Sequence, residues 1–157
     1  MKIKITKLAA SILMSLGAGA IGSVATVTGI NSWYAELIKP SFNPPNWIFG
    51  PVWTTLYIVM GVALYLIWQQ GLGKSFVKNS FILFVVQLVL NAAWSIAFFG
   101  MQNTGLALLV IALLWVSILI LIIRFYKINK LASYLLIPYI LWVSFASVLN
   151  FSIWQLN

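Results

Sequence analysis

The sequence predicts an all-α integral membrane protein, a single domain (1–157) built as a bundle of five transmembrane helices. Hydrophobic residues make up 63% of the chain and charged residues only 6%, whereas soluble domains average about 45–50% and about 25%. Because so few side chains are charged, the chain cannot cover a surface that faces water, and lipid must be its solvent. The charge-free stretches are also long enough for spans, which need about 20 apolar residues each.

The number of spans follows from where the charges fall, because ionisable side chains are costly inside a bilayer and should mark its edges. The charge-free stretches are 8–35, 40–73, 79–123 and 131–157. The third stretch is too long for one span and is divided by a turn-rich hexamer at 100–105. The expected spans are therefore 8–29, 47–69, 79–99, 105–124 and 132–154, with a long first loop at 30–46.

Five spans separate the basic residues onto two sides of the membrane. Lys39 lies alone on one side, and the other side carries Lys2, Lys4, Lys7, Lys74, Lys78, Arg124, Lys127 and Lys130. Because basic residues favour the cytoplasmic side, we expect a multi-pass membrane protein with a cytoplasmic N-terminus and its C-terminus outside. The basic start also resembles a secretory signal peptide. Its apolar run exceeds the about 7–15 residues of a signal core, so we expect it to remain as the first span.

The composition excludes most catalytic and metal chemistry. The chain has no Cys and no His, and Glu36 is its only acidic residue. It therefore lacks thiolate and imidazole metal ligands and a carboxylate pair for acid–base catalysis, and we expect no metal site. The nine basic residues are sparse and form no helical stripe, so we expect no nucleic-acid partner.

The first loop (30–46) is the longest expected connection, and it carries aromatic residues and three prolines. Long loops of this kind are often functional, for example as a lid over a site. Trp and Tyr also favour the headgroup level of a membrane, so an interfacial aromatic belt is equally compatible. Glu36 and Lys39 have the i,i+3 spacing of a solvated ion pair.

The third expected span carries a polar and aromatic stripe on one helical face, formed by Gln87, Asn91, Trp94 and Phe98. Amides in lipid face the interior, so the stripe either bonds neighbouring helices or lines a ligand site. Ala93 and Ala97 lie on a separate face and permit close helix approach, either within the bundle or at a homodimer seam. The first span also has small residues at four-residue spacing that permit close helix approach, namely Ser15, Gly19 and Ser23.

Two tryptophans lie away from the basic edges of their spans. Trp53 aligns with Tyr57 in the second span, and Trp142 aligns with Ala146 in the fifth. A tryptophan of an interfacial belt should lie nearer a span end. We therefore expect both indoles to face the interior of the bundle, where core packing is the simplest role.

Several segments together resemble the translocator protein / tryptophan-rich sensory protein (TspO) family, from about Gly22 to Trp154. These segments are 39–53 (KPSFNPPNWIFGPVW), 87–94 (QLVLNAAW), 98–100 (FFG) and 138–142 (PYILW), with Trp33-Tyr34, Leu56-Tyr57, Met60-Gly61 and Leu149-Asn150 between and after them. The resemblance implies a five-helix bundle with a pocket among spans one, two, three and five, capped by the first loop. It also implies frequent homodimers.

The resemblance further implies binding of tetrapyrroles such as protoporphyrin IX and heme-type porphyrins, and of isoquinoline- or benzodiazepine-type ligands. Its implied ligand-binding residues are Ser23, Thr26, Tyr34, Phe49, Gly50, Trp53, Asn91, Trp94, Trp142, Phe145, Ala146 and Leu149. Animal relatives also bind cholesterol through a segment with Tyr and Arg near the C-terminus. Phe151 and Gln155 stand there in this chain, so sterol binding at that segment is not implied. Leu106 stands where those relatives have Trp, so contacts with the drug-type ligands are expected to differ.

The function expected is that of a receptor-like membrane protein for porphyrins, which are bound as ligand or substrate and not covalently. Any catalysis would be their light-dependent oxidative breakdown, with Trp53 or Trp142 as electron or hydrogen donor, because without Cys, His or a second acid the chain offers no evident two-electron catalyst and the light-excited porphyrin would supply the reactive species. Two alternatives remain. The chain could facilitate porphyrin or sterol movement across the membrane, or it could be a ligand-dependent sensor or scaffold.

Overall fold

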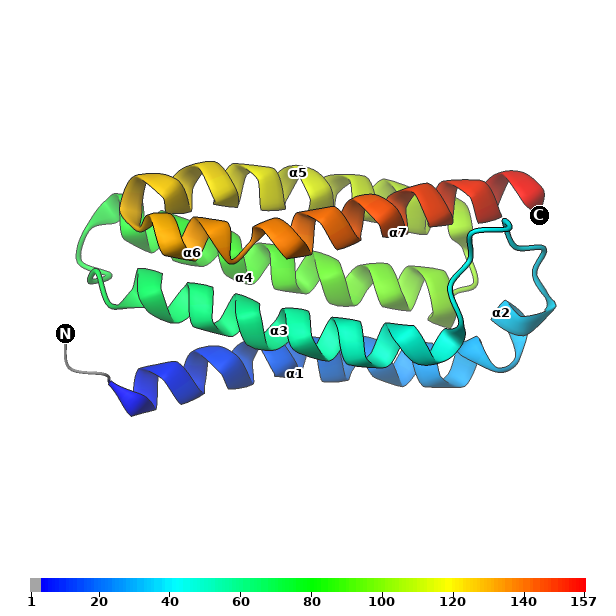
Figure 1. Cartoon of the computed structure of the whole chain (residues 1–157), viewed down its shortest axis with the longest axis horizontal. Coiled ribbons are helices and arrows are strands. Elements are labelled where there is room, and N and C mark those ends of the chain that lie inside the picture. Colours follow the sequence, from blue (N-terminus) through cyan, green and yellow to red (C-terminus); the bar gives the residue numbers. More distant parts are fainter. Residues whose placement is uncertain (1–3) are drawn as a thin grey trace.

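The computed structural model describes residues 4–157, which form five long helical rods running along one axis (Figure 1). The rods are α1 (Ile5–Ile30), α3 (Asn46–Trp68), α4 (Ser75–Ser95) with the π-helix η1 (Ile96–Gly100), α5 (Thr104–Ile128), and α6 (Lys130–Tyr134) followed by α7 (Ile137–Leu156). A short helix, α2 (Trp33–Glu36), lies in the first loop. All five rods are long and apolar enough to cross a membrane, so the predicted five-helix bundle is confirmed.

The rods begin and end where local chemistry favours a boundary. Asn103 caps α5, because its side-chain oxygen accepts from the amide of Leu106 at 2.8 Å, and Asn129 caps α6 in the same way. The fifth rod breaks between α6 and α7, just before Pro138. Proline lacks the amide that would continue the helical bonding and crowds the preceding turn, so the expected continuous span is two helices.

Small residues let α1 approach its neighbours closely. Its buried residues are Ser11, Ser15, Gly22 and Gly29. A Cβ atom at Gly22 would lie 3.1 Å from the Ser95 hydroxyl of α4, and one at Gly61 of α3 would lie 2.5 Å from Cα of Ile12. Gly19 faces the Tyr57 ring. Of the three small residues predicted for close approach in the first span, Ser15 and Gly19 therefore pack within the bundle, whereas Ser23 is exposed.

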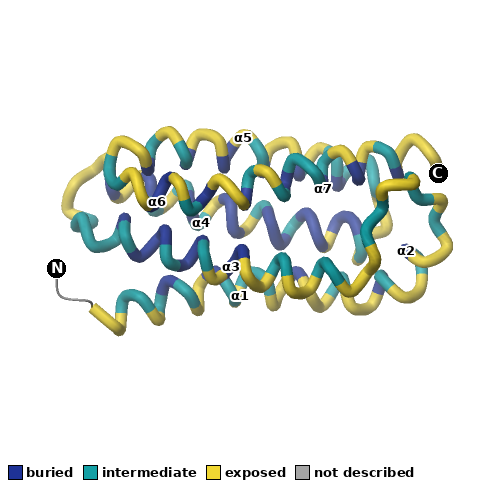
Figure 2. Tube along the Cα trace, viewed as in Figure 1, coloured by how far each residue is buried: buried dark blue, intermediate teal, exposed yellow. Residues whose placement is uncertain are grey.

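The bundle is apolar outside as well as inside. Figure 2 shows that buried residues are concentrated along α4, whereas α1 is the least buried rod. Large apolar side chains remain exposed on the outer surface, among them Leu13, Val24, Val89, Leu109, Leu141 and Val148. Such a surface would be a liability in water and suits lipid.

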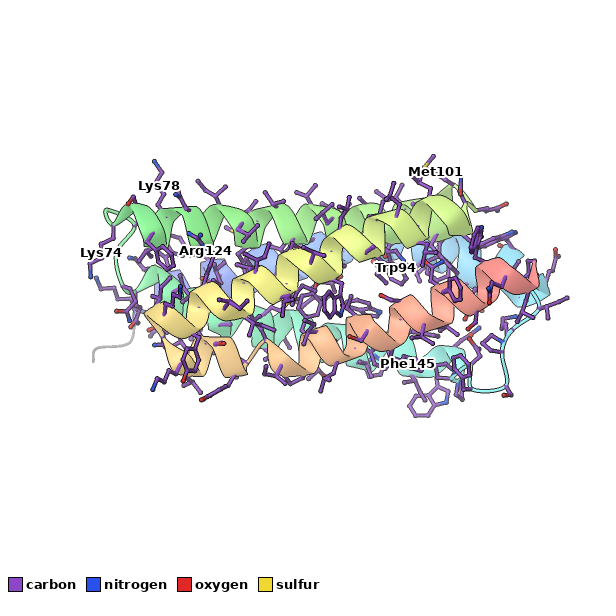
Figure 3. The ribbon with its side chains drawn as sticks, turned by 90° about the horizontal axis from the view of Figure 1, so that it is seen from above. Lys74, Lys78, Trp94, Met101, Arg124 and Phe145 are labelled. Carbon is purple, nitrogen blue, oxygen red and sulfur yellow. The ribbon has the colours of Figure 1, made fainter. Side chains whose placement is uncertain are left out.

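The described basic residues gather at one end of the bundle, apart from Lys39. Lys74, Lys78 and Arg124 lie at that end, and Met101 lies at the other (Figure 3). The Arg124 guanidinium is anchored there, since its Nε donates to the Ser80 hydroxyl at 2.9 Å. Lys39 follows α2 at the opposite end, and Lys2 lies outside the described residues. The predicted charge asymmetry is therefore present along the axis of the bundle.

The contact between α1 and α3 generates a stability prediction. Gly61→Ala should destabilise the folded protein by about 1–3 kcal/mol, as overpacking does, because the added methyl group meets the backbone of Ile12. Gly17→Ala is the matched control, since a Cβ atom at that helical glycine meets nothing within 4 Å. Thermal unfolding in detergent measures both. Equal stability of the two variants would contradict the close packing of α1 on α3.

Candidate ligand-binding pocket

A cavity of about 450 Å³ lies between α1, α3, α4 and α7, in the half of the bundle next to α2. This volume lies within the range of about 300–1,000 Å³ that is usual for small-molecule sites. Its walls are mostly apolar and aromatic. The lining residues are Leu16, Gly19, Ala20, Ser23, Thr26, Val27, Ile30, Tyr34, Asn46, Phe49, Gly50, Trp53, Thr54, Tyr57, Trp94, Ser95, Phe98, Phe99, Trp142, Ala146, Leu149, Asn150 and Ile153.

Trp53 lies at the centre of the aromatic wall. Its ring stacks on Tyr57 with centroids 5.8 Å apart, and it lies 6.0 Å from Trp94. It meets Tyr139 and Trp142 edge-on at 6.4 Å and 6.5 Å. These are favourable offset and T-shaped geometries for aromatic rings, so the position of Trp53 is fixed by a neighbour on its own helix, α3, and by residues of two other helices, α4 and α7.

A chain of hydrogen bonds crosses the bundle below Trp53. The Tyr57 hydroxyl donates to Asn91 Oδ1, and Asn91 Nδ2 donates to the Tyr139 hydroxyl at 2.9 Å. That hydroxyl donates to Gln87 Oε1 at 2.8 Å, and Gln87 Nε2 faces Met60 Sδ at 4.0 Å. Donors and acceptors follow one direction throughout, which strengthens each bond. We call Tyr57, Asn91, Tyr139 and Gln87 the polar chain.

The polar chain decides between the two interpretations of the third-span stripe. Gln87 and Asn91 are buried and bonded to tyrosines of α3 and α7, so they join helices. Trp94 does line the pocket, and its indole N–H donates to Asn150 Oδ1 at 3.1 Å. The Asn150 amide in turn donates to the Thr104 carbonyl. The stripe therefore joins helices through Gln87 and Asn91, and it lines the pocket through Trp94 nearer to α2.

Tyr34 forms the roof of the pocket. Its side chain is only 2% exposed, and its hydroxyl donates to Asn43 Oδ1 at 2.7 Å, which ties two parts of the first loop together. Burial raises the pKa of the Tyr34 hydroxyl to about 12, outweighing the opposite effect of the bond to Asn43. The group therefore stays protonated, and it remains a donor, at ordinary pH.

The first loop is also clasped by the end of α7. The Asn157 side chain accepts from the Ile38 amide and donates to the Ile38 carbonyl, both at 2.9 Å. Lys39 does not pair with Glu36. Its ammonium donates to the carbonyls of Ala35 and Leu37 at 3.1 Å and lies 4.9 Å from the centre of the Tyr34 ring. Backbone carbonyls thus replace the expected carboxylate partner.

Ten of the expected ligand residues line the cavity: Ser23, Thr26, Tyr34, Phe49, Gly50, Trp53, Trp94, Trp142, Ala146 and Leu149. Asn91 does not, because it lies in the polar chain with 1% of its surface exposed. Phe145 does not either. Its ring lies 6.4 Å from Phe42 of the first loop and 5.4 Å from Trp142, so it supports the indole from behind.

The expected dimer residues do not share an outward face. Ala93 is partly exposed, but Ala97 is buried at 3% and belongs to the core of the chain. The reason is that η1 packs against both α1 and α5, so Ala97 is covered by neighbouring helices although it follows Ala93 by about one turn. The prediction that Ala97 is available for a seam is therefore wrong.

Several wall residues were not predicted from the sequence. Tyr57 could have been found, since it follows Trp53 by one helical turn, and Phe98 lay on the recognised stripe. Leu16, Ala20, Val27 and Thr54 carry no such signal, because small and aliphatic residues occur on every face of these helices. The Trp142 indole N–H is buried without a hydrogen-bond partner in the described residues, which leaves one polar donor beside the pocket.

The fold and the pocket define a multi-pass membrane protein with an aromatic-lined internal cavity. A sequence profile of the TspO/MBR family matches residues 10–155. The chain is 46% identical over its whole length to the tryptophan-rich protein TspO of Chlorobaculum tepidum, covering 99% of that protein. It is 46% identical to the protein of the same name from Archaeoglobus fulgidus, over 99% of each chain. It is also 41% identical to the human translocator protein, over 80% of this chain and 75% of that one. The chain therefore belongs to the TspO/MBR family.

The polar chain generates a second prediction. Tyr139→Phe removes the hydroxyl that Asn91 and Gln87 both bind, which leaves the buried Asn91 Nδ2 and Gln87 Oε1 without their partner, while Asn91 Oδ1 keeps its bond from Tyr57. We expect a loss of about 1–2 kcal/mol in unfolding free energy, the range for hydrogen bonds between membrane helices. Tyr126→Phe is the control, because Tyr126 is 47% exposed. Unfolding in mixed detergent compares them, and a Tyr139→Phe protein as stable as the control would refute the role of the polar chain.

Proposed function

We propose that this membrane protein is a receptor for flat, conjugated ring molecules, foremost tetrapyrroles such as protoporphyrin IX and heme-type porphyrins. The observation that supports this most is the gathering of Trp53, Trp94 and Trp142 around one apolar cavity. Indole faces and edges offer large stacking surfaces to a flat ring. Isoquinoline- and benzodiazepine-type molecules share this chemistry and belong to the same proposal.

The proposed activity is the light-dependent oxidative breakdown of the bound porphyrin. The chain has no Cys or His, so the light-absorbing ligand has to supply the reactivity. Indoles and tyrosine phenols are the readily oxidised side chains of the pocket, and Trp53 and Trp142 line it with centroids 6.5 Å apart. In this proposal an indole gives one electron to the excited porphyrin, and the reduced porphyrin passes that electron to dioxygen from solution, which becomes superoxide. The oxidised indole then takes an electron back from the porphyrin, so the porphyrin is oxidised overall and dioxygen is reduced.

Two other functions have weaker support. Relatives are named translocator protein and tryptophan-rich sensory protein, which suggests movement or sensing of a ligand. Against a path across the bundle, the half away from α2 is filled by core side chains, including Phe84 stacked on Phe125 at 6.2 Å. The first loop gives some support to sensing. A ligand in the pocket would contact Tyr34 of this loop, and the same loop is bonded through Ile38 to Asn157 at the end of α7.

We place the protein in a bacterial cell membrane as a homodimer. A seam on α4 would use Ala93 without Ala97, because only Ala93 reaches the surface. The end that carries Lys74, Lys78 and Arg124 would be cytoplasmic by the positive-inside rule. Reporters fused to each terminus in a bacterial host should therefore show a cytoplasmic N-terminus and an external C-terminus. The reverse pattern would contradict this orientation.

The tryptophans are predicted to matter more for breakdown than for binding. Trp53→Phe and Trp142→Phe should each weaken protoporphyrin binding by only about 1–2 kcal/mol, since Phe keeps much of the stacking area. Both should lose most light-dependent bleaching, because Phe is much harder to oxidise than indole. Fluorescence quenching gives the affinity, and absorbance decay under fixed illumination at saturating protein gives the rate.

Trp47→Phe provides the matched control, because Trp47 is 73% exposed and does not line the pocket. It should keep both binding and bleaching. If bleaching in the pocket variants falls only in proportion to lost occupancy, the indoles are walls and not electron donors. If the double variant Trp53→Phe/Trp142→Phe bleaches normally, the protein is a binding protein and not an enzyme.

A further inference from the structure

The outer surfaces of α1 and α3 are joined at one end only. At the basic end, the Lys4 amide donates to the Tyr65 hydroxyl at 3.2 Å, and Gly61 packs against Ile12. Gly19 against Tyr57 is the next close approach. Between Tyr57 and α2, no hydrogen bond connects the two helices in the part of the chain that the structure describes. In the half of the bundle next to α2, the described residues of α1 and α3 are therefore joined neither by hydrogen bonds nor by close packing at a glycine of one helix against the other.

The pocket opens to the outside between these two helix halves. Every lining residue that is also exposed lies on one of the two edges: Ala20, Ser23 and Val27 on α1, and Asn46, Gly50 and Thr54 on α3. The lining residues from α4 and α7, by contrast, are buried or half-buried. A Cβ atom added at Gly50 would meet nothing within 4 Å. We call these six residues the side mouth.

The side mouth is chemically suited to lipid. It carries no charged residue, and its hydroxyl groups are satisfied within their own helices. Ser23 donates to the Ala20 carbonyl at 2.8 Å, and Thr54 donates to the Gly50 carbonyl at 2.9 Å. An unsatisfied polar group facing hydrocarbon would be costly. Asn46, the remaining polar residue of the side mouth, is the first residue of α3 and lies next to the first loop. Along the rest of the mouth, an apolar molecule can pass without stripping a polar group of its partner.

The roof of the pocket is closed by comparison. Tyr34 is 2% exposed, and its bond to Asn43 together with the two Asn157–Ile38 bonds holds the first loop in place. Entry from the aqueous side would require these bonds to break. Entry from the side requires α1, the least buried rod, to bend away from α3 in the half where no hydrogen bond of the described residues joins these two helices.

We infer that ligands enter and leave sideways, from the membrane leaflet next to α2, through the side mouth. The inference rests on the proposed function and narrows its ligand class to flat molecules that partition into lipid. The bilayer then acts as the reservoir from which the pocket is filled. The half of α1 that contains Ala20, Ser23 and Val27 is the gate, and the clasped roof stays shut.

The absence of native cysteine allows each route to be tied shut after folding. One double variant, Ser23→Cys/Gly50→Cys, bridges the side mouth. The matched variant, Ile38→Cys/Asn157→Cys, bridges the roof. Each is crosslinked in lipid nanodiscs with a bifunctional methanethiosulfonate reagent and later released by reduction. Protoporphyrin IX delivered from vesicles is the probe, and fluorescence quenching gives its association and dissociation rates before crosslinking, after it, and after release.

The side-mouth crosslink should slow both rates by at least about tenfold, which is about 1.4 kcal/mol in barrier height, and reduction should restore them. The roof crosslink should change both by less than twofold. Slowing by the roof crosslink alone, or by neither, would overturn lateral entry while leaving the proposed function intact. If even the unmodified chain shows no saturable binding, the proposed function fails, and lateral entry of this ligand class fails with it.

Discussion

The bundle depends on the satisfaction of its few buried polar groups, because lipid offers no hydrogen bonds to replace a missing partner. The polar chain meets this constraint at mid-bundle. It joins α3, α4 and α7 through two tyrosines and two amides, all buried. Apolar packing between helices in lipid gains little from the hydrophobic effect, so directional bonds of this kind have a large share in fixing which faces meet.

The polar chain also sets the floor of the pocket. Tyr57 is both its first donor and a wall residue, and Trp53 packs against Tyr57 and Tyr139. The position of Trp53 therefore depends on the hydrogen bonds of the polar chain, which lie below the pocket and hold Tyr57 and Tyr139 in place. On the side toward α2, the helices are joined mainly through Trp94, Asn150 and the first loop, which leaves an apolar space between them. The half of the bundle away from α2 is therefore filled by core side chains, and the half next to α2 contains the cavity.

The spans could be predicted from the sequence because charge is excluded from lipid, and nine basic residues and one acid are enough to mark the edges. The side of a helix that a residue occupies was harder to predict. Asn91 and Trp94 share a stripe, yet one bonds to tyrosines and the other faces the cavity. Helical periodicity predicts which side of a helix a residue lies on, but not whether that residue meets a neighbouring helix or the cavity at its level along the bundle. Ala97 was misplaced because η1 packs against α1 and α5, and the pattern of one helix does not show which neighbours cover it. The Asn157–Ile38 clasp joins positions too distant in sequence to leave a local pattern.

If a flat, light-absorbing ligand lies among Trp53, Trp94 and Trp142, as we propose, the chain's own tryptophans should report its position. The protein in nanodiscs would be saturated with protoporphyrin IX and illuminated, and oxidised residues would be mapped by peptide mass spectrometry. We predict early oxidation at these three residues, with Trp47 and Trp154 unchanged although they are 73% and 49% exposed. Oxidation that follows exposure, with Trp47 first, would contradict the claim and place the ligand outside the pocket.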